Sequence, residues 1–254
     1  MGYENHNRAC HTIDRVGSRT YPNVSSIKYK LVSDADVVET AVNQNFRSRF
    51  RTDDLLKRTL DLCIAISALV FLMPFMAFAA IMVRLADGGP SLFSQERIGR
   101  NGQTFRCYKF RSMITNSQEV LDELLATDPV AAAEWAADQK LRNDPRITKI
   151  GAFLRKTSLD ELPQLINVIR GEMSIVGPRP IIQAEIPRYG RAFNDYISVR
   201  PGLTGLWQVS GRNDTTYPQR VAMDRHYART NTVVGDIGII LRTIPAMLFS
   251  RGAF

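Results

Sequence analysis

Cysteine is scarce in this chain. Three cysteines occur among 254 residues, far apart, at Cys10, Cys63 and Cys107. An odd number at scattered positions predicts no disulfide framework, and the absence of a C-x-x-C pair removes the usual zinc signature. We therefore expect a reducing, cytosolic environment for the soluble part. His6 and His11 lie close to Cys10 in a polar stretch, which we interpret as chance proximity rather than a metal site.

Several signals of common function classes are also missing. Residues 1–45 contain no apolar core segment, so no secretory signal peptide is predicted. Neither a G-x-x-x-x-G-K-S/T loop nor a G-x-G-x-x-G loop is present, which leaves P-loop and Rossmann folds without support. No nucleic-acid-binding module and no interleaving of aromatic and basic residues is found, so we expect no nucleic acid partner.

Charge of one sign dominates what is present. The formal net charge is +8 and the pI is about 9.6, which predicts an anionic partner. Nucleic acid, an anionic membrane face and phosphorylated substrates all fit this charge, and charge alone does not distinguish them. Apolar residues make up 44% of the chain, enough for a substantial core in one large domain or two small ones.

The first 50 residues differ from the remainder. They are polar and rich in Asn, Ser and Arg, which predicts a flexible N-terminal arm over residues 1–50. Asp34-Ala35-Asp36 within this arm matches the D-x-D pattern by which many glycosyltransferases hold a metal and a nucleotide. Because three residues form a weak pattern, we interpret it as a solvated turn.

One apolar run stands out, over residues 62–83, where no charged residue occurs. Its length of about 22 residues is enough to cross a bilayer as a helix. Pro74 lies in the middle of the run and predicts a kink, because it removes a backbone hydrogen bond. Both flanks are basic, whereas a spanning helix usually leaves Lys and Arg mainly on the cytoplasmic side. From the residues alone, a spanning helix and a re-entrant helix that returns to the same side both remain open.

After this run, short elements alternate. The segment QTFRCYKF predicts a strand with Phe105 and Cys107 on one side. A helical stretch is expected over residues 117–140, interrupted near Asp128-Pro129, and another over residues 159–170, with Gly171 as its stop. Residues 216–229 and 234–249 also have helical patterns. The last helix carries an apolar stripe that fits the core or, by our preference, the membrane interface; its residues are Ile237, Ile240, Leu241, Ile244, Met247 and Leu248.

Two adjacent carboxylates are the main candidates for chemistry. Asp160 and Glu161 begin a predicted helix, and Ser158-x-x-Glu161 also fits a capping box, the ordinary structural explanation. Arg155 and Lys156 come just before the pair, and three further arginines occur on proline turns or beside glycine; the planar guanidinium group of arginine suits phosphate oxygens. Carboxylates that hold Mg²⁺ or attack phosphorus, among such arginines, are what phosphoryl transfer requires. These arginines are Arg155, Arg179, Arg200 and Arg212.

Four segments, in this order, carry a resemblance to a known family. They read KRTLDLCIAI, SLFSQERIGRNGQTFRCYKFRSM, DPRITKIGAFLRKTSLDELPQLINVIRGEMSIVGPRP and VRPGLTGLWQVSGRND. The chain resembles the bacterial sugar transferase family, the monotopic polyprenyl-phosphate phosphoglycosyl transferases, from about Asp54 to the C-terminus. It is most similar to the short members that begin exopolysaccharide repeat units with glucose or galactose.

The resemblance implies a mainly helical α/β fold. A small cytosolic part would lie on the membrane with interfacial amphipathic helices, preceded by a re-entrant helix broken at Pro74. The sugar transferase domain would cover residues 51–254, with the membrane helix at about 60–84 and the catalytic part at about 90–254. Met73 stands where some members have Ser before the proline, so the break would need another stabilising contact. Glu172 stands where some relatives have Asp, with little expected consequence.

The resemblance also implies an activity. Hexose 1-phosphate would pass from a UDP-sugar to undecaprenyl phosphate with release of UMP, at the cytoplasmic face of the bacterial inner membrane. Asp160 would attack the sugar-bearing phosphate, Glu161 would assist, and both would hold Mg²⁺ or Mn²⁺. Phosphate- or substrate-binding roles would fall to Arg155, Arg179, Arg200, Lys109, Arg111, Gln208 and Arg212.

The protein partners and the type of activity both have open alternatives. The resemblance leaves open a homodimer and contacts with other exopolysaccharide assembly enzymes. A glycosyltransferase that moves the sugar alone and releases UDP is the alternative activity, and a membrane-tethered binding protein is a third. The released nucleotide separates the three classes.

Overall fold

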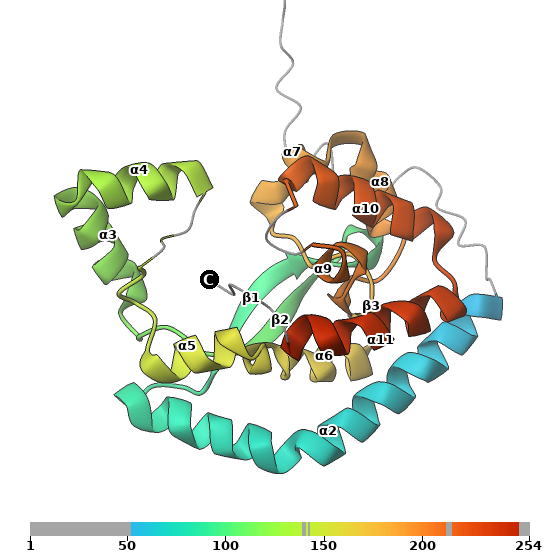
Figure 1. Cartoon of the computed structure of the whole chain (residues 1–254), viewed down its shortest axis with the longest axis horizontal. Coiled ribbons are helices and arrows are strands. Elements are labelled where there is room, and N and C mark those ends of the chain that lie inside the picture. Colours follow the sequence, from blue (N-terminus) through green and yellow to red (C-terminus); the bar gives the residue numbers. More distant parts are fainter. Residues whose placement is uncertain (1–51, 139–140, 142, 212–214, 249–254) are drawn as a thin grey trace, which may run out of the picture.

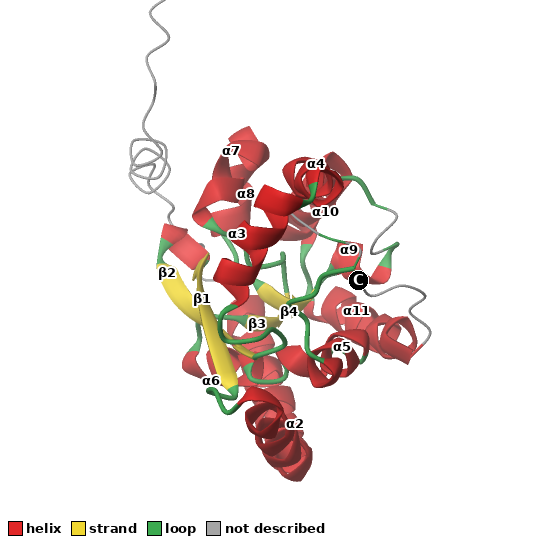
Figure 2. Ribbon diagram, turned by 90° about the vertical axis from the view of Figure 1, so that its left-hand side faces the viewer, coloured by secondary structure: helices red, strands yellow, loops and turns green. Residues whose placement is uncertain are grey.

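The computed structural model describes residues 52–138, 141, 143–211 and 215–248. The expected N-terminal arm, with Asp34-Ala35-Asp36, lies outside these residues, and so does Arg212. The described part is mainly helical with two small sheets, of which one lies at the surface and the other is buried among helices (Figures 1 and 2). The expectation of a mainly helical α/β fold with one long apolar helix is therefore confirmed.

The longest element is helix α2, Thr52–Asp87, of 36 residues. Among the described helices it is the one long and apolar enough to cross a membrane. Only one face of α2 packs on the protein core, which includes the buried Ala65 and Val83, whereas Phe71 is 75% and Phe78 is 65% exposed. Pro74 lies inside the helix, which bends in its middle but is not interrupted (Figure 1). One bent helix thus replaces the two helices that a break at Pro74 would give.

Helix α2 curves along one side of the protein body, and both of its ends contact that body (Figure 1). Near the start, the guanidinium of Arg58 donates to the carbonyls of Val168 and Ile169 at 2.7 and 3.0 Å. Near the end, Val83 is buried in a cluster with Phe110 and Leu154. The two ends of the apolar segment are therefore both attached to the same protein body.

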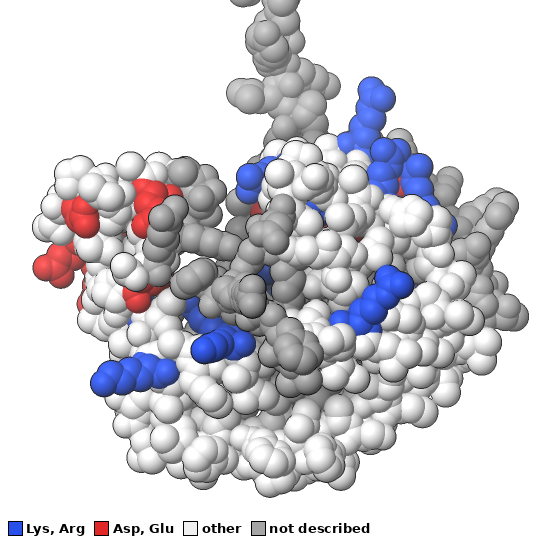
Figure 3. Space-filling view, viewed as in Figure 1, with Lys and Arg blue, Asp and Glu red and all other residues white. Residues whose placement is uncertain are grey.

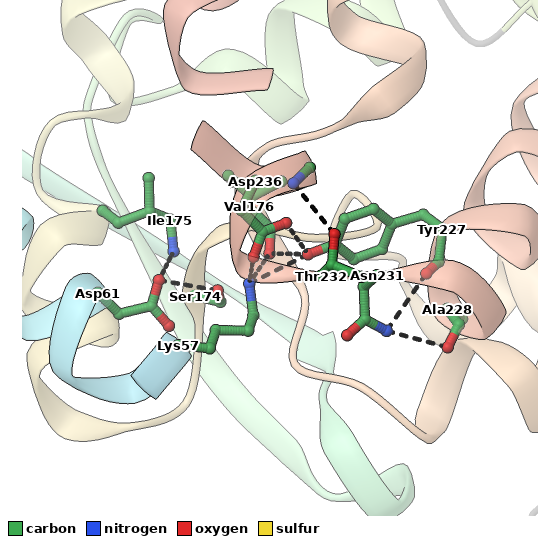
Figure 4. Close-up of polar contacts among 11 residues, drawn as sticks. Lys57, Asp61, Ser174, Ile175, Val176, Tyr227, Ala228, Asn231, Thr232 and Asp236 are labelled. Carbon is green, nitrogen blue, oxygen red and sulfur yellow. Dashed lines mark hydrogen bonds and ion pairs between the residues drawn. The ribbon is translucent and has the colours of Figure 1, made fainter. Parts of the chain in front are cut away.

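A buried polar network fixes the first turns of α2 (Figure 4). Lys57 Nζ lies 2.5 Å from Asp236 Oδ2 and donates to the carbonyl of Val176 and to the hydroxyl of Tyr227, both at 3.0 Å. The carboxylate of Asp61 accepts from the backbone N–H of Ile175 at 2.9 Å. Because these partners come from distant segments, the network sets the angle at which α2 leaves the body.

A β-hairpin follows α2. Strand β1, Leu92–Ile98, pairs antiparallel with β2, Thr104–Phe110, across the short 3-10 helix η2, Arg100–Gly102. Phe105 and Cys107 are buried, as the alternation of QTFRCYKF predicted. This hairpin carries Lys109 towards the middle of the molecule.

The next helices form a projecting pair. Helices α3, Ser117–Thr127, and α4, Pro129–Asp138, meet at Asp128, where the sequence predicted an interruption. Acidic side chains gather on this pair, whereas the part of the surface formed by α2 shows almost only uncharged atoms (Figure 3). The apolar surface and the acidic surface are thus separated.

The centre of the chain supplies short elements. Helix α5 is Lys149–Lys156, η3 is Leu159–Glu161 and α6 is Gln164–Arg170. Gly171 ends α6 in the left-handed region, with φ of 83°, as expected of a helix stop. Strand β3, Ser174–Val176, then pairs in parallel with β4, Gly202–Thr204.

The C-terminal half is helical and closes the core. The elements between β3 and β4 are η4 Gln183–Glu185, α7 Ile186–Tyr189, η5 Gly190–Ala192 and α8 Phe193–Ile197. The elements after β4 are α9 Leu206–Val209, α10 Tyr217–Thr230 and α11 Val233–Leu248. The predicted stripe of α11 is divided, since Leu241 and Ile244 are exposed whereas Ile240 packs against the core.

Candidate active site

Two backbone segments, one at Gly177 and one at Gly202–Gly205, cross so closely that only glycine fits at the contact points. A Cβ on Gly177 would lie 2.4 Å from the carbonyl oxygen of Arg200, and one on Gly202 would lie 2.1 Å from the amide nitrogen of Gly177. A Cβ on Gly205 would lie 2.3 Å from the carbonyl oxygen of Gly177. This close approach places the Gly-Pro-Arg-Pro turn beside β4. The exposed Arg179 is held there between two buried prolines.

Asp160 and Glu161 lie on η3, between α5 and α6. The capping box predicted for Ser158 is wrong, because Ser158 adopts the left-handed conformation, φ 57°, and its side chain forms no capping bond. The amide of Glu161 donates instead to the backbone carbonyl of Ser158, at 3.3 Å. The two carboxylates are therefore not explained by helix capping.

Helix α5 places Arg155 behind this turn. Thr148 caps the helix, its hydroxyl accepting from the amide of Gly151 at 2.9 Å. Gly151 lets α5 lie directly on the backbone of Ser112, since a Cβ there would be 1.9 Å from the Ser112 carbonyl oxygen. Arg155 Nε then donates to Ser112 Oγ at 2.8 Å. This contact holds the guanidinium of Arg155 near Asp160. The positive charge of Arg155 stabilises the ionised form of the Asp160 carboxylate.

Lys109 reaches the site from the end of β2. Its Nζ lies 2.6 Å from Glu161 Oε1, and the two side chains are 26% and 30% exposed. The fully buried Asn167 holds β2 against α6, accepting from the amide of Tyr108 and donating to the carbonyl of Arg106 at 3.1 and 2.7 Å. The strand that carries Lys109 is therefore fixed relative to the helix that follows Glu161.

A small pocket opens at this ion pair. Its lining has more cationic than anionic side chains, since Arg97, Lys109 and Arg179 face one carboxylate, that of Glu161. Such a pocket attracts an anion. The lining residues are Arg97, Cys107, Lys109, Glu161, Gln164, Arg179, Pro180, Gly202, Leu203 and Gln208.

Asp160 lies beside this pocket and is 9% exposed. Burial raises the pKa of Asp160 to about 6, against the lowering effects of the nearby Lys109 and Arg155 and with a smaller raising effect from Glu161. Burial, with Arg179 nearby, also lowers the pKa of Arg97. A buried carboxylate that is still mostly ionised at neutral pH is a better nucleophile than a solvated one.

The donor set is suited to a divalent cation only in part. Among the described residues no group of three or more His, Cys, Asp or Glu side chains comes together as a metal site. Asp160 and Glu161 supply two adjacent carboxylates. Mg²⁺ is commonly bound by one or two carboxylates together with substrate phosphates and water. The residues therefore fit a cation that arrives with a phosphorylated substrate.

Not every predicted site residue lies at this pocket. Arg111 is buried and pairs with Asp87 at the end of α2. Arg200 donates to the carbonyl of Gly171 at 2.9 Å, and its nearest charges include Arg100 and Arg58. Neither Arg111 nor Arg200 lines the pocket, whereas Lys109, Arg179 and Gln208 do.

Among the pocket residues that the sequence did not identify as site residues, Arg97 and Gln164 have strongly polar side chains. Arg97 lies opposite Phe105 in the hairpin, so it shares a face with Cys107 and Lys109 and donates to the carbonyl of Pro180 at 3.1 Å. Gln164, 3% exposed, begins α6 three residues after Glu161. The register of the hairpin would have identified Arg97, but that register depends on β1, which the sequence pattern did not define.

Comparison with known proteins places these residues in context. The family described as bacterial sugar transferase matches residues 52–250. A UDP-galactose-lipid carrier transferase of Erwinia amylovora is 55% identical over 199 residues, which are 78% of this chain and 42% of the relative. An undecaprenyl-phosphate galactose phosphotransferase of Salmonella typhimurium is 52% identical over 204 residues, 80% of this chain and 43% of the relative.

A shorter relative is covered nearly completely. The exopolysaccharide production protein ExoY of Sinorhizobium fredii is 50% identical over 198 residues, which are 78% of this chain and 88% of that protein. The chain thus spans less than half the length of the first two relatives and most of the third. In all three comparisons the similarity extends over most of this chain.

Proposed function

Since this chain belongs to the bacterial sugar transferase family, we propose that it transfers a hexose 1-phosphate from a UDP-sugar to undecaprenyl phosphate and releases UMP. The transfer would be the first membrane step of exopolysaccharide or related glycan synthesis. Relatives named for UDP-galactose, for undecaprenyl phosphate and for exopolysaccharide production support the donor, the acceptor and the glycan of this proposal. Glucose and galactose are the proposed hexoses.

The observation that carries the proposal is the buried Asp160 beside a cation-lined pocket. A diphosphate brings two or more negative charges, which Arg97, Lys109 and Arg179 would neutralise. Arg155 stabilises the ionised form of Asp160 and would keep it ready to attack. A protein that only bound the nucleotide sugar would have no need of a buried, ionised carboxylate next to the phosphates, since its charge opposes binding.

The reaction would proceed in two displacements at one phosphorus atom. A carboxylate oxygen of Asp160 forms a bond to the phosphorus that bears the hexose, and the bond from that phosphorus to the bridging oxygen breaks. UMP leaves with the electron pair on that oxygen. A phosphate oxygen of undecaprenyl phosphate then bonds to the same phosphorus, and Asp160 leaves as a carboxylate.

Mg²⁺ or Mn²⁺ would be held by Glu161 and Asp160 together with diphosphate oxygens, and it would supply charge neutralisation there. Lys109, Arg179 and Gln208, on the pocket wall, would orient the nucleotide sugar. Arg111, Arg200 and Arg212 are proposed for phosphate contacts beyond this pocket, on the motif resemblance alone.

We further propose that α2 enters the cytoplasmic leaflet of the inner membrane and returns to the same side. Its two ends contact one body, while its outer apolar face, which includes Val70, Met73 and Phe75, is exposed. The exposed face of α11 would lie in the membrane interface. Contacts of both arms with the body would stabilise the bend that a Ser before Pro74 assists in some members.

The released nucleotide tests the transfer. Purified protein is incubated with UDP-glucose or UDP-galactose, undecaprenyl phosphate and Mg²⁺, and the nucleotide is identified by chromatography. UMP together with a lipid diphosphate sugar is the expected result. UDP as the product would replace the proposal with a sugar-only glycosyltransferase, the alternative from the sequence.

Tag accessibility tests the membrane arrangement. Tags at the N-terminus and the C-terminus should both be reached from the cytoplasmic side in inverted vesicles. Pro74→Leu restores a backbone donor in the middle of α2 and should favour a straight spanning helix. A wild-type N-terminal tag on the periplasmic side would contradict the re-entrant arrangement.

A further inference from the structure

The ion pair between Lys109 and Glu161 occupies the place where the proposed function puts a divalent cation. Lys109 Nζ lies 2.6 Å from Glu161 Oε1, and both side chains are between a quarter and a third exposed, inside the pocket. The pair is therefore open to ligands, unlike a buried structural pair. One carboxylate would have to serve an ammonium group in the free protein and a metal ion in the complex.

These two uses compete. An ammonium group and a divalent cation repel each other, and the repulsion is large at the few-ångström separation that a shared carboxylate imposes. Lys109 also stabilises ionised Asp160 more than any other nearby charge does, so both candidate metal ligands are already partly neutralised. The described residues add no third acidic group to strengthen the site.

We propose that Lys109 is the resident counter-ion of Glu161 in the substrate-free protein and that it prevents tight metal binding until the nucleotide sugar arrives. The proposal rests on the proposed function. The diphosphate supplies the extra negative charge that allows a metal ion to replace Lys109 at Glu161. The metal ion and the UDP-sugar therefore bind together, and the free protein holds the metal weakly.

The displaced Lys109 has a second use. Arg97 is held by its donation to the carbonyl of Pro180 and by Glu185, 3.7 Å away. Arg179 is fixed on a turn between prolines. The ammonium of Lys109, on a flexible four-carbon stem, is the pocket cation best able to turn from Glu161 to a phosphate oxygen. One side chain would thus exclude the metal from the free site and then bind the substrate.

Binding of Mn²⁺ without nucleotide tests the proposal. Free Mn²⁺ is measured by electron paramagnetic resonance as it is titrated into the full-length protein in detergent. Lys109→Met removes the charge and keeps an unbranched side chain, and we expect it to bind Mn²⁺ about tenfold more tightly than wild type or better. Lys109→Arg keeps the charge and should bind as weakly as wild type.

A matched control separates this effect from net charge. Lys149→Met removes one positive charge from the exposed start of α5 and should leave Mn²⁺ affinity at the wild-type value. Added UDP-glucose should tighten Mn²⁺ binding more in wild type than in Lys109→Met. Should Lys109→Met not fold, Lys109→Gln removes the same charge with a polar side chain.

Equal Mn²⁺ affinity of wild type and Lys109→Met without nucleotide would overturn the proposal. The proposed function fails by a different measurement, because it is judged by the nucleotide product. Tighter Mn²⁺ binding by Lys109→Met in a protein that releases UDP would support the role of Lys109 and reject phosphoglycosyl transfer.

Discussion

Two lysine–carboxylate ion pairs have nearly equal distances between nitrogen and oxygen but lie in different surroundings. Lys57 and Asp236 are 2.5 Å apart and Asp236 is 2% exposed, whereas Lys109 and Glu161 are 2.6 Å apart and both partly exposed. Lys57 has three acceptors, and the hydroxyl of Tyr227 lies 2.7 Å from the second oxygen of Asp236. The first pair is closed by its neighbours and the second is open to a ligand.

The difference teaches how to distinguish structural charge from functional charge here. At the closed pair, burial and Asp236 raise the pKa of Tyr227, so the phenol stays a neutral partner of the network. At the open pair, the adjacent Asp160 is buried yet keeps a pKa of about 6. The hydrogen bonds of Lys57 and Asp236 fix α2 and α11, whereas partial exposure leaves the Glu161 site available for chemistry.

The largest expected effect is at the open site. Asp160→Asn keeps the shape of the side chain but removes the nucleophile, so UMP release should fall by about 10⁴-fold or more. The melting temperature should not fall, because the substitution also removes a buried charge. Incubation of wild type with labelled UDP-sugar and no lipid should give a phosphosugar adduct on the peptide that contains Asp160, seen by mass spectrometry.

Two different results would contradict the assignment of Asp160 as the nucleophile. Near-normal turnover by folded Asp160→Asn would end the nucleophile assignment. An inactive variant, with no adduct in wild type, would make Asp160 a metal ligand in a single displacement. Glu161→Gln should also be severe but should leave some turnover, because Glu161 assists and does not form the bond.

The closed pair should show the opposite behaviour. Lys57→Met leaves Asp236 buried without its counter-ion, and removal of one partner of a buried pair costs about 3–5 kcal/mol of folding free energy. The melting temperature in detergent should fall clearly, while UMP release per folded molecule stays near that of wild type. The double variant Lys57→Met with Asp236→Leu should recover part of the loss. Unchanged melting of Lys57→Met would remove the distinction between the pairs.

The pH dependence sharpens the comparison with a smaller effect. With a pKa of about 6, Asp160 should be needed in its ionised form, so kcat/KM rises with pH through about 6 and then levels off. Because its pKa is raised from 3.8, the folded state binds this proton more tightly than the unfolded state. The contribution of Asp160 to stability therefore falls as pH rises from about 4 to 6.

Melting curves across pH check this sign. Asp160→Asn should be as stable as wild type near pH 4 and relatively more stable above pH 6. A stability difference between Asp160→Asn and wild type that shrinks as pH rises would contradict the raised pKa.

The smallest expected effect is at Ser158. Its side chain forms no capping bond, so Ser158→Ala should change the folding free energy by no more than about 0.5 kcal/mol, against about 1 kcal/mol for a true cap. Thr148→Ala, which removes the observed cap of α5, serves as the comparison. Chemical or thermal unfolding of both variants measures the two losses of folding free energy. Equal losses for Ser158→Ala and Thr148→Ala would restore the capping box at Ser158.

Local signals predicted much of this molecule. The interruption at Asp128-Pro129, the stop at Gly171 and the alternation of Phe105 and Cys107 depend on neighbouring residues, and the structure confirms all three. The structure also confirms the last two helices, which the sequence predicted over residues 216–229 and 234–249. The adjacent carboxylates were found because their chemical type is visible in the sequence.

Long-range features were not predicted, for a physical reason. Arg97 joins the pocket through the register of the hairpin, and Arg111 turns to Asp87 on a different element. The left-handed backbone of Ser158 redirects the turn that carries Asp160. Spacing along a chain does not specify such directions, because they depend on which distant elements meet.

The crossing of Gly177, Gly202 and Gly205 has a consequence for heritable variation. Every missense change in a glycine codon enlarges the residue, and at these positions the added atom would meet backbone, which cannot rotate away as a side chain can. Arg179 is exposed and lacks this packing constraint, so any intolerance there would come from its place in the pocket lining and not from packing. A survey of tolerated alleles should therefore show three sharp gaps, one at each of these glycines.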